Sequence, residues 1–314
     1  MSLRLLKNSF RPSTTAKATA TSIRPATSLL PTQRHISIPT HAPMAQTTVQ
    51  AADGSNIELT LRPNQERGNA DHGWLKTFHT FNFADYYDPR FEKWGSLRVI
   101  NEDRVEAKQG FGTHAHREFE IFSYIVQGEL QHRDSMGNVE VMKRGDVQLT
   151  SAGTGIRHSE MTHGDNQVHF LQIWSLPSTR GLPPKYYHRH FSDEEKRKGL
   201  VPVVAKQGEE GVNDSREGTG PTPVHSPLWL YATLLGAGNK VEHALKMKKG
   251  YVHVVQTSGY NTEASKGNRV KVNGALELGE GDGAFVTATG DASEIVRIEN
   301  IGDAEAEVLL FDLA

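Results

Sequence analysis

The chain lacks cysteine, lacks long apolar runs, and has no acidic residue in its first 52 positions. Without cysteine it can form neither disulfides nor thiolate metal sites, and it has no cysteine nucleophile. Any metal ion must therefore be held by nitrogen and oxygen atoms. No stretch approaches the roughly 18–20 consecutive apolar residues that a transmembrane helix needs, so the sequence predicts no membrane span.

The missing acids divide the chain into a basic start and an acidic body. Residues 1–52 contain six Lys or Arg residues. Because the whole chain carries a net charge of −2, residues 53–314 carry −8. A nucleic-acid-binding face is basic, since it must neutralise phosphates. The charge therefore argues against direct nucleic-acid binding by the body.

The first 52 residues have the composition of a targeting leader, rich in Ser, Thr, Ala and Arg. On a helix, the apolar residues at 3, 6 and 10 and the basic residues at 4, 7 and 11 would form separate stripes. Such a basic, amphipathic, acid-free segment is typical of a mitochondrial transit peptide, removed after Arg34. The alternative is a disordered tail without an address. Met44 offers an internal start that would give a cytosolic form.

Short apolar runs separated by turn residues begin near residue 57 and predict an all-β fold. The runs with strand-like length and composition are "LRVI" (97–100), "EIFSYIVQGEL" (120–130), "VEVMKRGDVQLT" (139–150) and "VHFLQIWSL" (168–176). Asp and Gly turns lie between them, at 134–138 and 144–146. Many short strands at this spacing indicate an antiparallel sandwich or barrel.

The pattern predicts two barrels in tandem, at 57–180 and 228–314. The segment between them, 181–227, is polar and rich in Pro and Gly, so we expect a connection with one short helix at 192–198. In the second half "YVHVVQTSGY" echoes "SYIVQGEL", and "LELGEGDGAFV" echoes "EVMKRGDVQLT". Gly-Asp turns are common enough for one chance echo, but two in the same order favour duplication.

Two histidine-containing stretches carry the chemistry, "GFGTHAHREFEIFSY" (110–124) and "SAGTGIRHSEM" (151–161). On a strand, residues i and i+2 point the same way, so His114 projects with His116, and His158 with Glu160. If the two strands face each other inside a barrel, three imidazoles and one carboxylate converge. That donor set suits Fe, Ni, Co, Cu or Zn, either as a saturated site or as an octahedral ion with open positions. A chance His-x-His among 15 histidines is the alternative.

The second half lacks this pattern. His243 and His253 stand alone there, and we expect both to be surface or packed residues rather than ligands. The sequence therefore predicts the same architecture in both halves, with a metal site in the first half alone.

These motifs resemble the pirin family of bicupins. The resemblance rests on G-T-H-A-H-R-E-F-E, S-M-G-N, G-D-V-Q and S-A-G-T-G-I-R-H-S-E-M, and on flanking stretches such as "HGWLKTFHTFNFADYYDP" and "VLLFDL". It spans about residues 58–314 and is closest to the bacterial-type branch similar to quercetin 2,3-dioxygenase. It implies two tandem antiparallel β-barrels with few short helices. It also implies Fe(II) in the N-terminal barrel, with His114, His116, His158 and Glu160 as ligands.

The sequence departs from the general cupin pattern at Glu120. That pattern takes its carboxylate ligand four residues after the second histidine, whereas pirin-like proteins take it from the later motif, here Glu160. We therefore expect Glu120 to orient a ligand imidazole, and expect Glu160 or Glu120 to act as the catalytic base. Glu118 shares the parity of the ligand histidines and could also face the metal. Ser151 replaces the usual cupin proline, in agreement with the pirin version.

For other residues that lie near the two motifs in sequence, the pattern predicts a role less specifically. His132, His163 and His169 are expected to be structural or exposed to solvent. Three aromatic residues could line a pocket for an aromatic substrate, although core packing is their commoner use. They are Phe111, Phe119 and Trp174.

The resemblance implies an iron-dependent dioxygenase that opens flavonol-like phenolic substrates. A second hypothesis is a non-enzymatic, iron-binding and redox-responsive regulator that binds partner proteins, as some pirins are transcriptional coregulators. A third, a cupin with a sugar-isomerase or storage role, would use Glu120 as a metal ligand. The acidic body and the leader favour the enzyme over a nuclear regulator.

Overall fold

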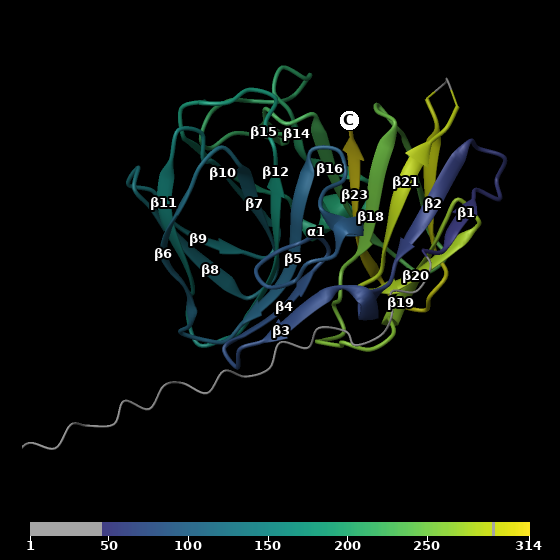
Figure 1. The fold of residues 1–314 in the computed structure, drawn as a ribbon, viewed down its shortest axis with the longest axis horizontal. Helices are drawn as coiled ribbons and strands as arrows, with labels where there is room; N and C mark the ends of the chain where they lie inside the picture. The colour runs from purple at the N-terminus through teal and green to yellow at the C-terminus, as the bar shows by residue number, and fades with distance from the viewer. Residues whose placement is uncertain (1–45, 291–292) are drawn as a thin grey trace, which may run out of the picture. The chain divides into compact units, whose positions relative to one another are not determined.

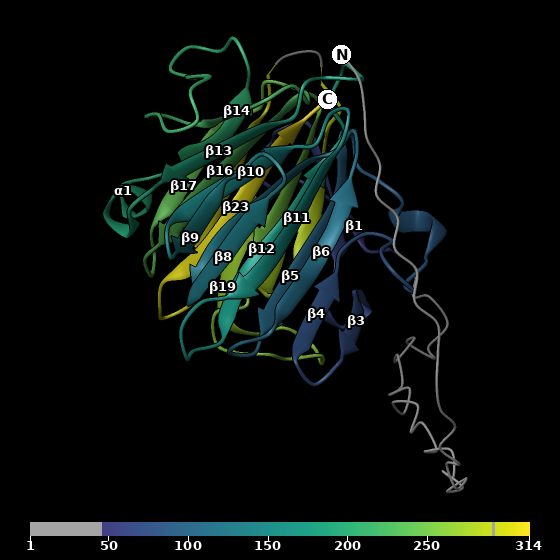
Figure 2. The same cartoon turned by 90° about the vertical axis from the view of Figure 1, so that its left-hand side faces the viewer.

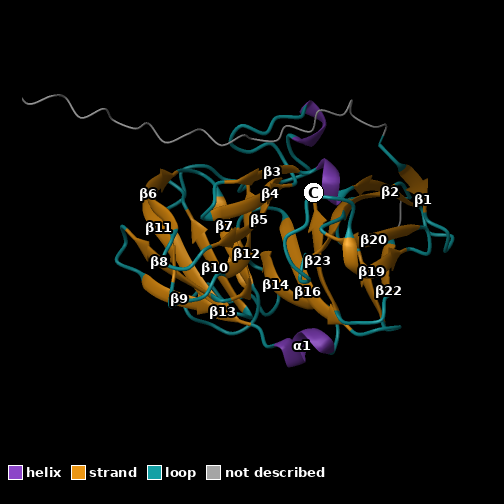
Figure 3. Ribbon diagram, turned by 90° about the horizontal axis from the view of Figure 1, so that it is seen from below, coloured by secondary structure: helices purple, strands orange, loops and turns teal. Residues whose placement is uncertain are grey.

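The regular secondary structure of the described chain is almost entirely β-strand, as Figure 3 shows. The computed structural model describes residues 46–290 and 293–314, which lie in one compact unit. The helical segments within these residues are η1 (Asn64–Glu66), η2 (Pro89–Phe91) and α1 (Asp193–Arg197). Ser192 caps α1 and forms a capping box with Glu195, which confirms the short helix predicted there. In this part of the chain no helix has the length and apolar character that a membrane crossing requires.

The N-terminal half consists of two antiparallel sheets. The seven-stranded sheet has the order β13 (Lys185–His190), β10 (Asp146–Ser151), β7 (Glu120–Gln127), β12 (Val168–Ser175), β5 (Leu97–Val105), β4 (Leu75–His79) and β3 (Gly68–Asp71). The four-stranded sheet has the order β6 (Gly110–His116), β11 (Ile156–Thr162), β8 (Glu129–Asp134) and β9 (Val139–Lys143). Figure 2 looks onto this smaller sheet.

The C-terminal half repeats this arrangement. Its eight-stranded sheet has the order β1 (Thr48–Gln50), β2 (Ile57–Arg62), β21 (Gly283–Ala288), β18 (Lys249–Val254), β23 (Ala306–Leu313), β16 (Leu228–Leu235), β14 (Val201–Lys206) and β15 (Thr222–Val224). Its four-stranded sheet has the order β17 (Lys240–Ala244), β22 (Ile295–Asn300), β19 (Lys266–Val272) and β20 (Leu276–Glu280). The pairing is antiparallel except between β14 and β15.

The two halves correspond strand for strand from β5–β12 to β16–β23. The order β10-β7-β12-β5 in one sheet matches β21-β18-β23-β16 in the other, and β6-β11-β8-β9 matches β17-β22-β19-β20. In Figure 1 the blue and teal strands form the first barrel and the green and yellow strands the second. The all-β, two-barrel fold predicted from the sequence is confirmed, and the shared strand order supports duplication.

Several strands pair with a different barrel, or a different part of the chain, from the one that the sequence predicts. β2, at the expected start of the N-terminal barrel, pairs with β21 and so belongs to the C-terminal sheet; Figure 1 shows it, in purple, beside the yellow strands. β13, in the expected connection, pairs with β10 in the N-terminal sheet, and β14 and β15 join the C-terminal one. The prediction of a purely linking segment at 181–227 is therefore wrong. The proposed leader at 1–52 lies mostly outside the described residues, but β1 shows that its last residues belong to the fold.

The two barrels differ in how their interiors are filled. The apolar cluster of the C-terminal barrel is large and includes residues from both of its sheets, such as Ile57, Val270 and Leu310. The corresponding cluster of the N-terminal barrel is small, and Phe170 and Met142 belong to it. The rest of the N-terminal interior is lined by histidine, polar and aromatic side chains around a cavity. Because apolar packing fills only part of this barrel, it has room for a functional site.

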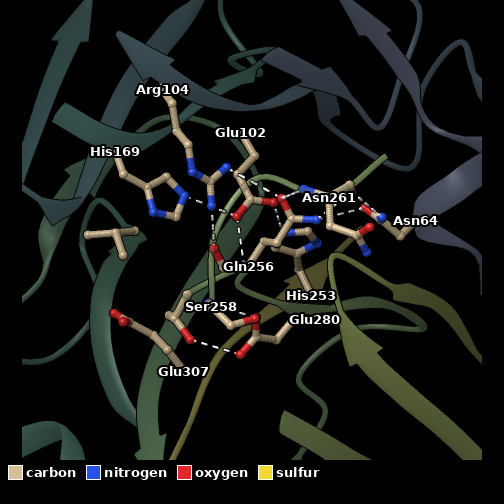
Figure 4. Close-up of polar contacts among 12 residues, drawn as sticks. Asn64, Glu102, Arg104, His169, His253, Gln256, Ser258, Asn261, Glu280 and Glu307 are labelled. Carbon is tan, nitrogen blue, oxygen red and sulfur yellow. Dashed lines mark hydrogen bonds and ion pairs between the residues drawn. The ribbon is translucent and has the colours of Figure 1, made fainter. Parts of the chain in front are cut away.

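A large apolar cluster and a buried polar group join the two barrels. The apolar cluster includes Phe122 and Leu171 from the first and Phe311 from the second. Glu102 on β5 forms the centre of the polar group: it accepts hydrogen bonds from His169 Nε2 at 3.1 Å and from His253 Nε2 at 3.3 Å (Figure 4). These two histidines come from different barrels, so the polar group ties the halves together.

Candidate metal centre

Strands β6 and β11 form the base of the candidate site because they bring the two histidine motifs side by side. His114 is the direct cross-strand partner of His158. The register shifts by one residue next to this pair, because Glu160 lies opposite Phe111 rather than Gly112. The extra residue in β6 makes a β-bulge, a feature that commonly re-aims side chains next to active sites.

The three predicted ligand histidines lie together. The ring centroids of His114, His116 and His158 are 4.6–4.8 Å apart pairwise. His114 Nε2 lies 3.1 Å from His158 Nε2. His114 Nδ1 lies 2.8 Å from the carbonyl oxygen of Gly112, which can only accept, so Nδ1 carries the hydrogen and Nε2 presents a lone pair. The bulge thus sets the tautomer of His114, the usual way in which a ligand imidazole is prepared for a metal.

The spacing of these nitrogens fits a common metal ion. Two imidazole nitrogens that each lie about 2.1 Å from one ion, at a right angle, would be about 3 Å apart. The observed 3.1 Å between the Nε2 atoms of His114 and His158 agrees with that value. Burial, together with the neighbouring histidines, lowers the pKa of His116 to about 4. Burial also lowers the pKa of His158 to about 4, so both rings are neutral near pH 7, as metal ligands must be.

Glu160 lies beside this triad, buried, on the same strand as His158. Its Oε1 accepts from Ser123 Oγ at 3.3 Å, and its Oε2 accepts from Gln172 Nε2 at 2.9 Å. Burial alone would raise the pKa of this carboxyl, but His158, His132 and the hydrogen bond from Gln172 lower it overall. Glu160 is thus an ionised carboxylate whose position is fixed by two donors.

His132 also belongs to this cluster, although the sequence predicts a structural or solvent-exposed residue. It is fully buried on β8, opposite Glu160, and its nitrogen lies within 4.8 Å of the ligand atoms of His158 and Glu160. His132 Nε2 donates to Asp134 Oδ2 at 3.1 Å, because a carboxylate can only accept. A sequence signal was present, since His132 and Asp134 have the His-x-Asp spacing of a strand face.

Glu120 does not lie in the cluster, contrary to the expectation that it orients a ligand imidazole or acts as the base. Its Oε1 accepts from the backbone N–H of His225 at 2.7 Å, and its Oε2 accepts from the backbone N–H of Ser226 at 2.9 Å and from the Ser226 hydroxyl. The carboxylate therefore anchors the segment before β16. Glu118 accepts from the Gly181 N–H and lies in the turn between β6 and β7, so strand parity does not extend to it.

A cavity of about 140 Å³ opens beside the histidines inside the N-terminal barrel. His114, His116 and Glu160 line one side of it, and Phe111 and Trp174 are among its aromatic lining residues. These two aromatics thus occupy the place expected of them.

Phe119 packs against Trp174 with ring centroids 5.2 Å apart rather than lining this cavity. Phe83, which the sequence does not predict as a pocket residue, does line the cavity and contacts Trp174 edge to face. The remaining nearby histidines follow the expectation, since His163 is half exposed and His169 belongs to the junction between the barrels.

The matching strands of the C-terminal barrel hold no such cluster. In β17 and β22 the positions facing each other include Glu242 and Arg297, which form an ion pair of 3.0 Å. His243 donates through Nε2 to Asp312 Oδ2 at 2.8 Å, and His253 is bound to Glu102. Both histidines therefore have structural partners, as expected. Duplication has preserved the strands but not the donor set.

Comparison with known proteins places the chain among homologues along most of its length. The Pirin family profile matches residues 60–175. Quercetin 2,3-dioxygenase of Escherichia coli strain K12 is 39% identical over 257 residues, which are 81% of this chain and 98% of that protein. A putative quercetin 2,3-dioxygenase of Pseudomonas aeruginosa is 35% identical over 246 residues, 77% of this chain and 99% of that protein.

Solved structures give the same result. The crystal structure of YhhW from Escherichia coli has a TM-score of 0.69 and 37% identity, and the match covers 82% of this chain and 97% of that one. The structure of bacterial pirin YhhW in complex with nickel(II) has a TM-score of 0.68 at 37% identity, with 81% and 98% covered.

Proposed function

The chain belongs to the pirin family, and on that premise we propose that it is a metal-dependent dioxygenase acting on flavonol-like phenolic substrates. One observation carries the proposal. His114, His116 and the ionised carboxylate of Glu160 line a cavity that also has aromatic lining residues, and His158 completes the histidine triad beside it. The cavity lies inside the barrel whose apolar core is incomplete. Relatives named quercetin 2,3-dioxygenase at up to 39% identity support the choice of reaction and substrate class.

The chain's own residues would prepare the site for a metal and a substrate. His114, His116 and His158 would hold the ion, with Glu160 as the oxygen donor beside them. A bound divalent first-row ion would supply Lewis acidity toward substrate oxygen atoms and, for iron, the redox chemistry that oxygenases need. Glu160 is ionised and lines the cavity, so it can also accept the proton of a phenolic hydroxyl.

The aromatic walls suit a flat substrate. Phe83 and Trp174 meet edge to face, and Trp174 also meets His116 edge to face at 4.9 Å. Such surfaces bind aromatic rings by stacking and exclude water from them. A phenolic ring between these walls would lie next to the histidines.

We propose Fe(II) as the native ion. Three nitrogen donors and one carboxylate resemble the facial sets of oxygen-activating iron sites in leaving positions free. The nickel(II) complex of YhhW concerns a relative, and nickel fits the same donor set. Purification without dioxygen followed by elemental analysis tests the choice: iron at about one equivalent is expected, and stoichiometric nickel without iron would refute it.

Oxygen uptake by the iron-loaded protein with quercetin tests the function. We expect uptake with release of carbon monoxide, loss of uptake to background in His114→Ala, and a rate within about twofold of wild type in His163→Ala. His163 is the matched control because it is half exposed and lies away from the cavity.

The result in His114→Ala decides the catalytic claim. Unchanged uptake in that variant would remove it. If the wild type takes up no oxygen with any of a panel of phenols, the enzymatic proposal is wrong, and the non-enzymatic role with protein partners takes its place.

We also propose that the basic leader directs the protein to mitochondria, with a cytosolic form started at Met44. The support is compositional, since six basic residues and no acid precede Asp53. β1 begins at Thr48, so the address must lie before it. A fusion of residues 1–45 to a fluorescent protein should enter mitochondria, and a diffuse signal would contradict the proposal.

A further inference from the structure

Strands β4, β5 and β12 contribute most of the polar residues that line the cavity. Asp103 and Thr77 are cross-strand partners on β5 and β4, and both line the cavity. Gln172, on β12, lines it as well and is the residue that holds Glu160.

Asp103 is a buried carboxyl whose hydrogen bonding is incomplete. Its side chain is only 4% exposed, and its Oδ1 has no hydrogen-bond partner among the residues that the structure describes. The other buried carboxylates discussed above are well satisfied. Glu102 accepts from Arg67, His169, His253 and a backbone N–H, and Glu120 accepts from the residues before β16. An unsatisfied buried polar group costs about 1–3 kcal/mol, so its retention calls for an explanation.

Three further residues that line the cavity also have an unpaired side-chain atom. Thr77 Oγ1, Gln172 Oε1 and Trp174 Nε1 have no partner in the described part of the chain. The wall therefore presents acceptors on Asp103 and Gln172, a donor on Trp174, and the hydroxyl of Thr77, which can do either. A hydroxyl group both donates and accepts, so it complements this set.

We propose that Asp103 is a substrate-binding residue whose carboxyl forms a hydrogen bond with a phenolic hydroxyl of the ring that enters the cavity. The inference deepens the proposed function, on which it rests for the class of substrate. Asp103 would fix the orientation of that ring relative to the histidines and Glu160. The residues of this wall would thereby select hydroxylated rings over apolar rings of the same size.

The size and electrostatics of the cavity agree with this role. Its volume of about 140 Å³ is close to that of the engineered protein cavity of about 150 Å³ that binds benzene, so it holds about one ring. Burial, reinforced by the charge of Glu160, raises the pKa of Asp103 to about 7. A carboxyl group whose pKa is raised can donate as well as accept a hydrogen bond, which suits a hydroxyl partner.

Binding of phenol and toluene to the iron-loaded protein without dioxygen tests the inference. The two probes have nearly the same size and differ in the hydroxyl group, so the ratio of their affinities reports hydroxyl recognition. We expect Asp103→Leu to lower the phenol-to-toluene affinity ratio about tenfold, the value of one hydrogen bond. Asp103→Asn should retain most of the ratio, because the amide both donates and accepts. Titration calorimetry or protein NMR measures both affinities.

Gln148→Leu is the matched control. Gln148 is buried in the same barrel and its Oε1 also lacks a partner among the described residues, but it does not line the cavity. Its ratio should stay within twofold of wild type. Should Asp103→Leu fail to fold, Asp103→Val takes its place, since valine suits a strand.

The outcomes separate this inference from the proposed function. An unchanged ratio in a folded Asp103→Leu with native metal content overturns it, as does failure of the wild type to bind phenol. If the wild type takes up oxygen with quercetin while the ratio is unchanged, the role of Asp103 alone is refuted. If the ratio depends on Asp103 but no flavonol is oxidised, the dioxygenase proposal alone is refuted.

Discussion

A single backbone carbonyl determines how His114 can act. Gly112 lies in the bulge of β6, and its carbonyl oxygen accepts a hydrogen bond from Nδ1–H of His114, which leaves the lone pair of Nε2 on the side of His158. Strand parity in the sequence predicted that His114 and His116 share a face. It could not predict the bulge, because a bulge is a property of the pairing between two strands and not of either one.

Metal affinity should depend weakly on pH down to about 5.5. Protonation competes with metal binding only near the pKa of a ligand, and the pKa values of His116 and His158 are lowered to about 4. Calorimetric titration with Zn²⁺ should show a loss of about tenfold or less between pH 7.0 and 5.5. Three histidines with ordinary pKa values near 6.5 would lose roughly tenfold each. A thousandfold loss would therefore contradict the burial of these rings.

Glu120→Gln should leave metal binding intact and lower stability. Glu120 accepts two backbone N–H groups and the Ser226 hydroxyl, and hydrogen bonds to a charged group contribute about 1.5–3 kcal/mol each. We expect the free energy of unfolding in urea to fall by about 2 kcal/mol, with unchanged metal content. Glu160→Gln is the contrasting variant, which should lose metal. Metal loss in the Glu120 variant would restore the ligand role that the general cupin pattern gives it.

The errors in the site prediction share a cause. The position of Glu120, four residues after His116, predicts a place in the site, but its partners, His225 and Ser226, lie 105 and 106 residues away in sequence. The sequence predicts a structural or exposed His132, yet β8 pairs with β11 and brings it to His158. The spacing of residues along one strand predicts which side chains share a face of that strand. Which other residues that face contacts depends on pairing between strands that are far apart in sequence.

At the scale of elements, the position of β2 in the C-terminal sheet is the feature that is hardest to predict from the sequence. Apolar runs predicted several central strands, including β5, β7, β10 and β12, and the two sequence echoes correspond to β18 and β21. The pairing of β2 with β21 joins residues more than 200 positions apart, and no sequence pattern specifies it. β13 holds the equivalent position beside β10 in the other barrel.

Leu59→Ala should therefore destabilise the C-terminal barrel although residue 59 precedes the N-terminal one. Leu59 is fully buried in the apolar cluster of the C-terminal barrel. Truncating a buried leucine costs about 2–5 kcal/mol, which urea unfolding would detect. Thr60→Ala, the half-buried neighbour on the other face of β2, should cost less than about 1 kcal/mol. Equal effects of the two substitutions would argue against the pairing of β2 with β21.

At the scale of the whole molecule, the junction makes the two barrels one cooperative unit. Glu102, from the metal-site barrel, accepts hydrogen bonds from His253 of the second barrel and from His169 of the first. It also forms an ion pair with Arg67, whose Nη1 lies 3.0 Å from Glu102 Oε2. The surrounding apolar cluster draws on both halves. Unfolding of one barrel would expose this polar group and that cluster together, so the halves should unfold in a single transition.

Acid should weaken this junction in two stages. Burial lowers the pKa values of His169 and His253, so below the ordinary value of about 6.5 the unfolded chain binds protons that the folded chain does not. Stability is therefore complete above pH 6.5 and falls by up to about 1.4 kcal/mol per pH unit for each such histidine. The pKa of Glu102 is well below its usual range despite burial, because His169, His253 and Arg67 favour its charged form. Its contribution is lost at still lower pH.

Replacing His253 by an uncharged donor isolates the first stage. In His253→Gln the amide can still donate to Glu102 but cannot bind a proton, so the loss of unfolding free energy between pH 7 and pH 5 should be smaller than in wild type. His163→Gln removes a half-exposed histidine and should leave the profile unchanged. Urea unfolding at each pH measures both. Parallel profiles for His253→Gln and wild type would mean that His253 binds its proton equally well in the folded and the unfolded chain, which would contradict a pKa lowered by burial.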